Sequence, residues 1–335
     1  MDILYQYYLT FLDNLGVNEP LSLILWYIFP FLLACCAFFI ISSLLRWIEK
    51  KIYKLIKNTS KINAIEELPI NDFKNGKLAF IMIMVPSIYL WGVIPYSNKY
   101  IPISADINTL LILSILMFLL YSFLLLGKDK VYKKTESKTV IAVLSFLPPI
   151  LISLLSVILL TSSIDLNKII LAQSKMQNSS GWLLTPLVLG FLVFVAGIIC
   201  ILSLLEKKLK INNFALLKIS NSRIKFLLLC YYSIIFMLCA YCVCLFLGGY
   251  LPPLGFYVGE IYQIHYVLST SVVYLEQIFW LFFKSLLLAT FIIGFKIRFS
   301  EIKKRKLVNF AWYVLFPASI INLIISMIIP FLGRN

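Results

Sequence analysis

Eight apolar segments separated by polar loops are the feature of this sequence that most constrains its fold. Each has about 20 residues, the length at which an α-helix crosses the hydrocarbon core of a bilayer and satisfies its own backbone amides there. The sequence therefore predicts eight transmembrane helices, at approximately 21–45, 78–97, 107–127, 140–162, 182–205, 226–248, 272–295 and 308–332.

The composition agrees with a membrane protein and excludes two common classes. Apolar residues make up 61% of the chain and charged residues 13%, against about half and about a quarter in soluble domains. An ordinary cytosolic enzyme is thereby excluded. The net charge of +15 is interrupted by apolar segments, which argues against a nucleic-acid-binding surface. We predict an all-α integral membrane protein in which residues 1–335 form a single polytopic domain.

The placement of Lys and Arg predicts the orientation of the helices. Of the 30 basic residues, 25 fall in the first, third, fifth and seventh loops, between Arg46 and Lys77, Lys128 and Lys138, Lys207 and Lys225, and Lys296 and Lys306. Loops on the inner side of a membrane retain such residues. We therefore expect the basic loops on the inner side and both termini on the outer side.

The first inner loop, residues 46–77, begins with an amphipathic segment. Ile48 and Ile52 share one helical face, whereas Lys50 and Lys54 share another. This pattern predicts a helix at the inner interface of the membrane. Two interpretations stay open: an anchor to anionic lipid, or the entrance of a site that an amphiphilic ligand reaches from the bilayer.

Lys284 is the only ionisable residue deep in a predicted span. An unpaired charge there costs about 2.5 to 3.5 kcal/mol or more, so a partner is expected. Lys284 either contributes to a proton or ion relay or polar lining, or pairs with the carbonyl groups of a neighbouring helix. Glu276, two turns earlier, either shares its face or lies at the interface.

Prolines and glycines predict irregular backbone at three places. Pro148 and Pro149 in the fourth span, and Pro186 near the start of the fifth, should kink their helices and leave room for a cavity. The segment Gly248–Pro253 combines turn-forming residues with an aromatic and is expected to form a packed re-entrant turn.

Signals for metals, disulfides and targeting are absent from the sequence. All seven cysteines lie in predicted spans, and Cys239 and Cys242 are interpreted as packing residues because His and carboxylates are missing around them. The single histidine, His265, cannot assemble a metal site. Residues 1–20 contain no Lys or Arg, so we expect no secretory or transit peptide.

Three segments near the carboxyl end carry a resemblance to a known family. They are Leu245–Pro253 (LFLGGYLPP), Lys284 with Lys296 twelve residues later, and Ala311-Trp312 followed by Pro317 through Asn322. These segments resemble, in order and spacing, subunit 1 of mitochondrial NADH dehydrogenase, the H subunit of bacterial respiratory complex I. Weaker similarities are Glu49-Lys50-Lys51, Pro69 through Asp72, Ala172-Gln173 and Leu205-Glu206.

The sequence also departs from that family. A glutamate of the family's fourth span is replaced in Ser145-Phe146-Leu147, and the family's acidic fifth loop is replaced by the basic segment from Lys207 to Lys225. The chain is thus similar to a divergent member, in which the family's proton path through this subunit is altered.

The resemblance implies a core membrane-arm subunit of NADH:ubiquinone oxidoreductase, which is not active alone. It implies that Glu49, Lys50, Asp72 and Lys296 line a quinone tunnel and that Glu206 and Lys284 belong to a polar coupling axis for proton translocation. It further implies ubiquinone as substrate, FMN and iron–sulfur clusters in partner subunits, and no redox cofactor in this chain. Implied partners are the iron–sulfur subunits docked on the inner basic loops, the neighbouring membrane-arm subunits and lipids, with no nucleic acid.

Two alternatives stay open, together with the compartment. The chain could instead be a secondary transporter of a small anionic metabolite, although no two-fold repeat is evident, or a membrane scaffold or assembly subunit without a site. The 26 Phe and 19 Tyr against 13 Gly are typical of an AT-rich genome. We therefore expect the mitochondrial inner membrane, with basic loops on the matrix side, and as second choice a bacterial plasma membrane.

Overall fold

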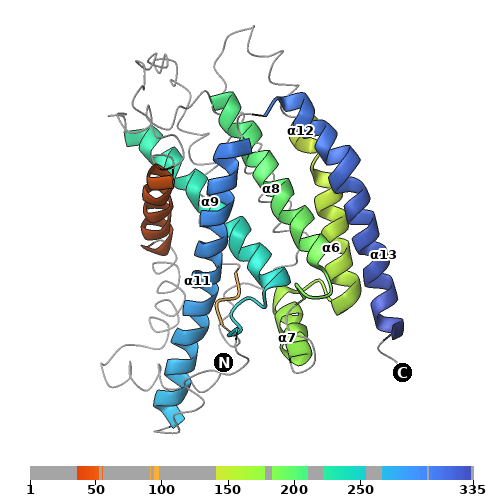
Figure 1. The fold of residues 1–335 in the computed structure, drawn as a ribbon. Coiled ribbons are helices and arrows are strands. Elements are labelled where there is room, and N and C mark those ends of the chain that lie inside the picture. Colours follow the sequence, from red (N-terminus) through yellow and green to blue (C-terminus); the bar gives the residue numbers. More distant parts are fainter. Residues whose placement is uncertain are drawn as a thin grey trace, which may run out of the picture.

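The computed structural model is helical throughout the part of the chain that it describes (Figure 1). The described residues are 36–52, 55, 91, 94–97, 141–177, 183–209, 222–253, 266–299 and 302–332. Residues 36–52 form one continuous helix. The other elements are α6 (Leu147–Thr161), α7 (Leu166–Gln177), α8 (Val188–Leu209), α9 (Ser222–Phe246), α11 (Tyr266–Phe299), α12 (Lys304–Phe310), the π-helix η3 (Ala311–Leu315) and α13 (Phe316–Leu332).

Four helical stretches are long and apolar enough to cross a membrane: Ile141–Thr161, Leu229–Phe246, Val272–Phe299 and Lys304–Ile329. A shorter apolar stretch is Val188–Leu204. They correspond to the last five predicted spans, which supports the prediction of an all-helical membrane protein. The first span is described only from residue 36 and the second only around residues 91–97, while the third lies outside the described residues. The number of eight spans and the sides of the termini therefore stay predictions.

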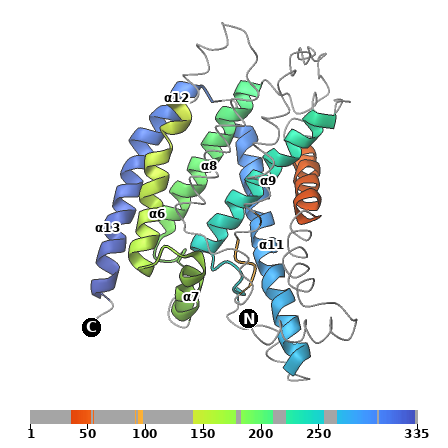
Figure 2. The ribbon, with the colours of Figure 1, turned by 180° about the vertical axis from the view of Figure 1, so that it is seen from behind.

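Helix α9 forms the centre of the bundle. Every side chain from Cys230 to Phe246 is buried. Helices α8 and α11 pack against α9, while α6 and α13 pack against α8 and against each other. In both ribbon views α13 and the helix of residues 36–52 lie at opposite edges (Figures 1 and 2).

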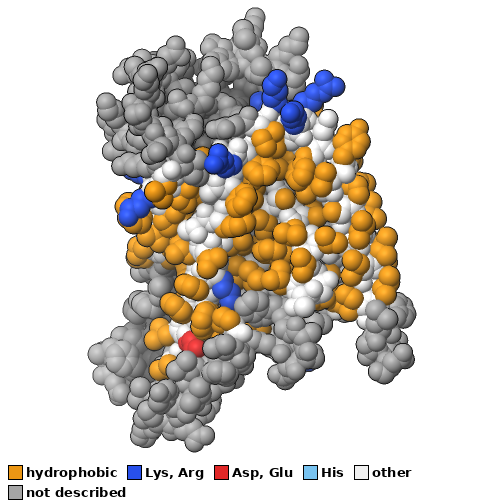
Figure 3. All heavy atoms as spheres, in the orientation of Figure 1, with side chains coloured by type: hydrophobic (Ala, Val, Ile, Leu, Met, Phe, Trp, Pro, Cys, Tyr) orange, Lys and Arg blue, Asp and Glu red, His pale blue; other side chains and the backbone are white. Residues whose placement is uncertain are grey.

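The helix ends next to two predicted inner loops lie at one end of the bundle. The carboxyl ends of α8 and α11 and the amino ends of α9 and α12 all point to the top of Figure 1. In Figure 3 most of the visible Lys and Arg side chains gather toward this end, above a face covered by hydrophobic side chains. We call it the basic end. The side of the membrane on which this end lies stays a prediction from charge.

Asn322 on α13 is hydrogen-bonded to both α8 and α6. Its Oδ1 accepts from the backbone N–H of Gly190 at 2.9 Å, and its Nδ2 donates to Ser156 Oγ at 2.5 Å. Ser153 Oγ donates to the Gly190 carbonyl at 2.7 Å. Because α8 begins at Val188, the Gly190 N–H is one of the donors that an α-helix leaves without an internal acceptor. A Cβ at Gly190 would lie 2.6 Å from Asn322 Nδ2, so the close approach requires glycine.

The π-helix η3 keeps one side of the last span facing the bundle. Buried residues recur every four positions at Leu307, Ala311, Leu315 and Ser319. In a regular α-helix, residues four positions apart are rotated by about 40° around the helix axis, so they would gradually leave the buried side. The π-turn has more residues per turn and reduces this rotation; it is closed by the hydrogen bond from Phe316 N–H to the Ala311 carbonyl. Pro317 has no N–H for the preceding turn, which favours the irregularity.

The structure corrects three details of the sequence analysis. Residues 166–177, predicted as part of an outer loop, form the helix α7. Pro186 precedes α8 instead of lying within it, whereas the helix is interrupted at residues 145–146, next to Pro148, as predicted. The helix of residues 36–52 continues through the predicted boundary at residue 45.

We predict that Asn322→Ala lowers the thermal unfolding midpoint of the purified protein, because the buried N–H of Gly190 would lose its acceptor. The expected loss is about 1 to 3 kcal/mol. Ile321→Ala is the matched control, because Ile321 is exposed on the same helix. Equal midpoints for the two variants in the same detergent would contradict the role of Asn322.

Candidate functional site

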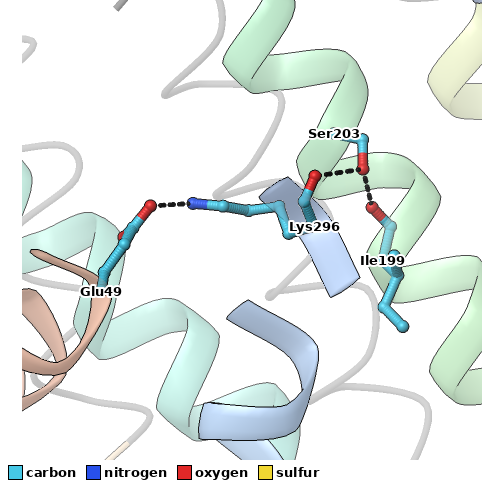
Figure 4. A network of polar contacts seen from close by, with 4 residues as sticks. All are labelled: Glu49, Ile199, Ser203 and Lys296. Carbon is cyan, nitrogen blue, oxygen red and sulfur yellow. Dashed lines mark hydrogen bonds and ion pairs between the residues drawn. The ribbon is translucent and has the colours of Figure 1, made fainter. Parts of the chain in front are cut away.

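A buried ion pair connects two segments that lie far apart in the sequence (Figure 4). The ammonium nitrogen of Lys296, on α11, lies 2.6 Å from Glu49 Oε1, on the helix of residues 36–52. Both side chains are only 2% exposed. Since a charge removed from water is costly unless it is paired, each of the two depends on the other for its stability.

Aromatic and hydroxyl groups surround this pair. The Lys296 ammonium lies 5.4 Å from the ring centroid of Tyr231, within the range of a cation–π interaction. Tyr232, next on α9, interacts electrostatically with both charges of the pair. Ser203 on α8 donates to the Ile199 carbonyl at 2.6 Å and lies 3.5 Å from the Lys296 carbonyl oxygen. The ion pair thus lies where α8, α9, α11 and the helix of residues 36–52 come together.

Lys284 occupies a second polar cluster on the same helix. Its ammonium donates to the carbonyl oxygens of Leu247, Gly249 and Leu251, at 2.8, 3.1 and 2.5 Å. These contacts use all three donors of an ammonium group. Of the two interpretations left open by the sequence, the structure therefore shows pairing with carbonyls, supplied by the turn after α9. Glu276 is half-buried and accepts from Trp280 Nε1 at 3.3 Å.

The backbone of that turn is shaped by its two glycines. Gly248 and Gly249 have φ angles of 73° and 53°, in the left-handed region where glycine lacks the steric penalty of other residues. The turn is buried from Gly248 to Pro252, which agrees with the predicted packed turn. Its conformation places three carbonyl oxygens around one ammonium group.

Helix α7 is hydrogen-bonded to the same turn and to the end of α9 that precedes it. Gln173 Nε2 donates to the carbonyls of Cys244 and Leu245, at 2.8 and 3.2 Å, at the carboxyl end of α9. Tyr250 donates its hydroxyl to Asn167 Oδ1 at 3.1 Å. The sequence pattern does not predict this helix, because α7 is too polar to resemble a span.

An aromatic cluster fills the space between α9, α11 and residues 91–97. Trp91 stacks on Phe236 with ring centroids 5.4 Å apart, and Phe282 stacks on both Phe236 and Tyr96. The indole N–H of Trp91 donates to Ser233 Oγ at 2.7 Å. Trp91 and Tyr96, which belong to the second predicted span, thus pack against α9 and α11.

The predicted site residues separate into groups. Glu49 and Lys296 are in contact, and Lys50 is half-buried next to Glu49. Lys284 precedes Lys296 by twelve residues, which is about 18 Å along a helix. Glu206 lies on α8, but its side chain is outside the described part of the structure, and Asp72 is outside it entirely.

One sequence-based expectation about charge is wrong. The sequence places Lys296 in an inner loop, yet α11 continues to Phe299 and buries it. Glu49 and Lys296 are thus buried in the helical bundle in addition to Lys284, the only ionisable residue deep in a predicted span. Among the described residues, no group of three or more His, Cys, Asp or Glu side chains could hold a metal ion.

Comparisons with known proteins agree with the resemblance found in the sequence. The family described as NADH dehydrogenase matches residues 72–327. The match includes the turn, Lys284 and Lys296, whereas Glu49 lies before it.

Curated relatives extend this result. The H subunit of the NADH-quinone oxidoreductase of Anoxybacillus flavithermus is 28% identical over 193 residues, which are 56% of this chain and 51% of that protein. The H subunit of the same enzyme from Dehalococcoides mccartyi is 25% identical over 257 residues, 74% of this chain and 65% of that protein. The chain therefore spans between about half and just under two thirds of the length of these relatives. With a family match that covers most of its residues, the chain belongs to the NADH dehydrogenase family.

Proposed function

We propose that this chain is a core membrane subunit of a proton-translocating NADH:quinone oxidoreductase and forms part of its quinone-binding tunnel. Family membership supports the assignment to such a complex. The observation that carries the assignment of the site is the buried pair of Glu49 and Lys296 near the basic end. The subunit would not act alone: FMN and iron–sulfur clusters in partner subunits would deliver the electrons, and the inner basic loops would dock those partners.

The chemistry of the ion pair suits a quinone headgroup. Reduction of a quinone to a quinol takes up two electrons and two protons, and its carbonyl oxygens accept hydrogen bonds. Lys296 can donate such a bond, while Glu49 can hold or release a proton. Lys50 and Asp72 would line the entrance of the tunnel, and the apolar faces of the helices would contact the isoprenoid tail.

Lys284 and Glu206 would contribute to the coupling of quinone reduction to proton movement. Lys284 is 8% exposed and its side-chain nitrogen is bound by three carbonyls, so the group is held in one position inside the bundle. A change in the charge of the pair at Lys296 would be felt along α11 through a medium of low dielectric constant. In this proposal α11 and α8 carry the polar axis of the subunit.

The proposed location is a bacterial plasma membrane. The relatives named above are bacterial, which favours this choice over the mitochondrial inner membrane expected from composition. The proposed neighbours are the other membrane-arm subunits and lipids.

We predict that the chain purifies from its native membrane with flavin, iron–sulfur proteins and NADH-oxidising activity. Electron transfer to an added quinone should depend on its presence. A particle of the chain's own 38.6 kDa that moves a solute would instead identify a secondary transporter. Co-purification without any turnover would identify a scaffold or assembly subunit.

A double-mutant cycle at the ion pair separates function from stability. Glu49→Gln or Lys296→Met alone leaves one buried charge unpaired, at a cost of about 3 to 5 kcal/mol, so we predict loss of assembled complex. The double variant has no unpaired charge and should recover assembly, but its quinone reductase activity should stay at least about tenfold below wild type.

The matched control for this cycle is Lys51→Gln, because Lys51 is exposed on the same helix. It should leave assembly and turnover unchanged. Co-purification of the partner subunits with a tagged form of this chain reports the amount of assembled complex in every variant. A double variant that recovers quinone reduction together with assembly would show that the pair is structural only.

A further inference from the structure

The face of the last span that points away from the bundle carries different residue types from the face that points into the bundle. The side that faces the bundle carries Leu307 and Leu315 together with small or polar residues, namely Ala311, Ser319, Asn322 and Ser326. The exposed side, which we call the α13 edge, carries larger apolar residues: Trp312, Tyr313, Val314, Pro317, Ile320, Ile321, Ile324, Ile325, Met327 and Ile328. Contacts between membrane helices favour small residues that allow close approach. The α13 edge has none among its exposed residues, so it suits lipid chains better than another helix.

The buried polar side chains of this span form their hydrogen bonds within this chain. Ser319 Oγ donates to the Phe316 carbonyl and Ser326 Oγ to the Leu323 carbonyl, at 2.6 and 2.7 Å. Asn322 is bound to α6 and α8. These hydrogen bonds satisfy Ser319, Asn322 and Ser326 within the bundle.

A cluster of cations lies at the upper end of this edge. Lys303, Arg305 and Lys306 are exposed and Lys304 is half-buried. We call these four residues the basic head. Glu301 precedes this segment in the sequence, and from Ile302 to Asn335 there is no Asp or Glu, so the segment itself is positively charged. In Figure 3 basic side chains lie directly above the hydrophobic surface on this side of the molecule.

Two aromatic residues lie between the basic head and the aliphatic part of the edge. Trp312 is 47% exposed and Tyr313 is 78% exposed. They follow Arg305 by seven and eight residues, or about 10 to 12 Å along a helix. Trp and Tyr favour the boundary between hydrocarbon and headgroups. With these rings at that boundary, the long basic side chains reach the level of the phosphates.

We propose that the basic head binds the phosphate of an anionic phospholipid whose acyl chains lie along the α13 edge. Charge complementarity selects an anionic headgroup, and the absence of small residues selects lipid over a neighbouring helix. The proposal is independent of the quinone site, because the α13 edge and the helix that carries Glu49 lie on opposite sides of the bundle (Figures 1 and 2).

Photoactivatable lipids test the proposal on the intact complex in phosphatidylcholine nanodiscs. One probe carries a phosphatidylglycerol headgroup and the other a phosphatidylcholine headgroup, with the same reactive acyl chain. Mass spectrometry of digested protein then measures labelling of the residues between 307 and 328. We expect the anionic probe to label this segment at least about fivefold more than the neutral probe, and high salt to remove the difference.

The variant Lys303→Gln/Arg305→Gln/Lys306→Gln should lower labelling by the anionic probe to that of the neutral probe. The control Lys168→Gln/Lys175→Gln removes two exposed cations from α7 and should change nothing. The charge-retaining variant Lys303→Arg/Lys306→Arg should label as wild type does, which excludes misfolding as the cause of a loss. Co-purification of the partner subunits with each variant confirms that each complex is assembled.

Equal labelling by the two probes, or unchanged labelling of the triple glutamine variant, would overturn the proposal. So would crosslinks from the α13 edge to a neighbouring subunit in place of lipid. These outcomes leave the proposed quinone function untouched, whereas a complex without quinone reductase activity could still show the predicted lipid labelling.

Discussion

The cost of removing charged and polar groups from water in the interior of the bundle is the constraint on which this structure depends. A buried cation there must find its partners within the protein, and two lysines of α11 do so in different ways. Lys296 pairs with a carboxylate, whereas Lys284 is bound by three backbone carbonyls. The Asn322 amide satisfies the same requirement for the first turn of α8. These contacts connect helices that apolar packing alone would align only loosely, because lipid tails compete for the same surfaces.

Helix α11 is consequently tied to the bundle at two levels. Near the basic end it is joined to the helix of residues 36–52 through Glu49, and about 18 Å away along its axis it is joined to the turn after α9. Helix α9 contributes to both, through Tyr231 beside the ion pair and through the glycine turn at its carboxyl end. The proposed quinone chemistry and the proposed coupling therefore share one helix, while the proposed lipid-binding edge lies on the opposite side of the bundle.

The sequence predicts those parts of the structure that depend on local pattern. The apolar segments locate the five long apolar helices that follow residue 140 to within about six residues, and the glycines and prolines of residues 248–253 predict the turn. The sequence pattern misplaces Lys296 because this residue begins a run of charges that is typical of a loop, and only burial against Glu49 shows that the helix continues. Glu49 and Lys296 are 247 positions apart, so no local sequence pattern predicts their contact. The sequence does not predict helix α7, because its polar residues resemble those of a loop. Their role is visible only in the structure, where Gln173 and Asn167 bind the end of α9 and the turn that follows it.

The claim that most needs a direct test is that a quinone binds beside Glu49 and Lys296. The measurement is an electron cryomicroscopy map of the intact complex with bound quinone. We expect elongated density among the first, fifth, sixth and seventh spans, with the headgroup within hydrogen-bonding distance of Glu49 or Lys296. An interior filled by side chains at that place, with the quinone bound elsewhere, would contradict the claim.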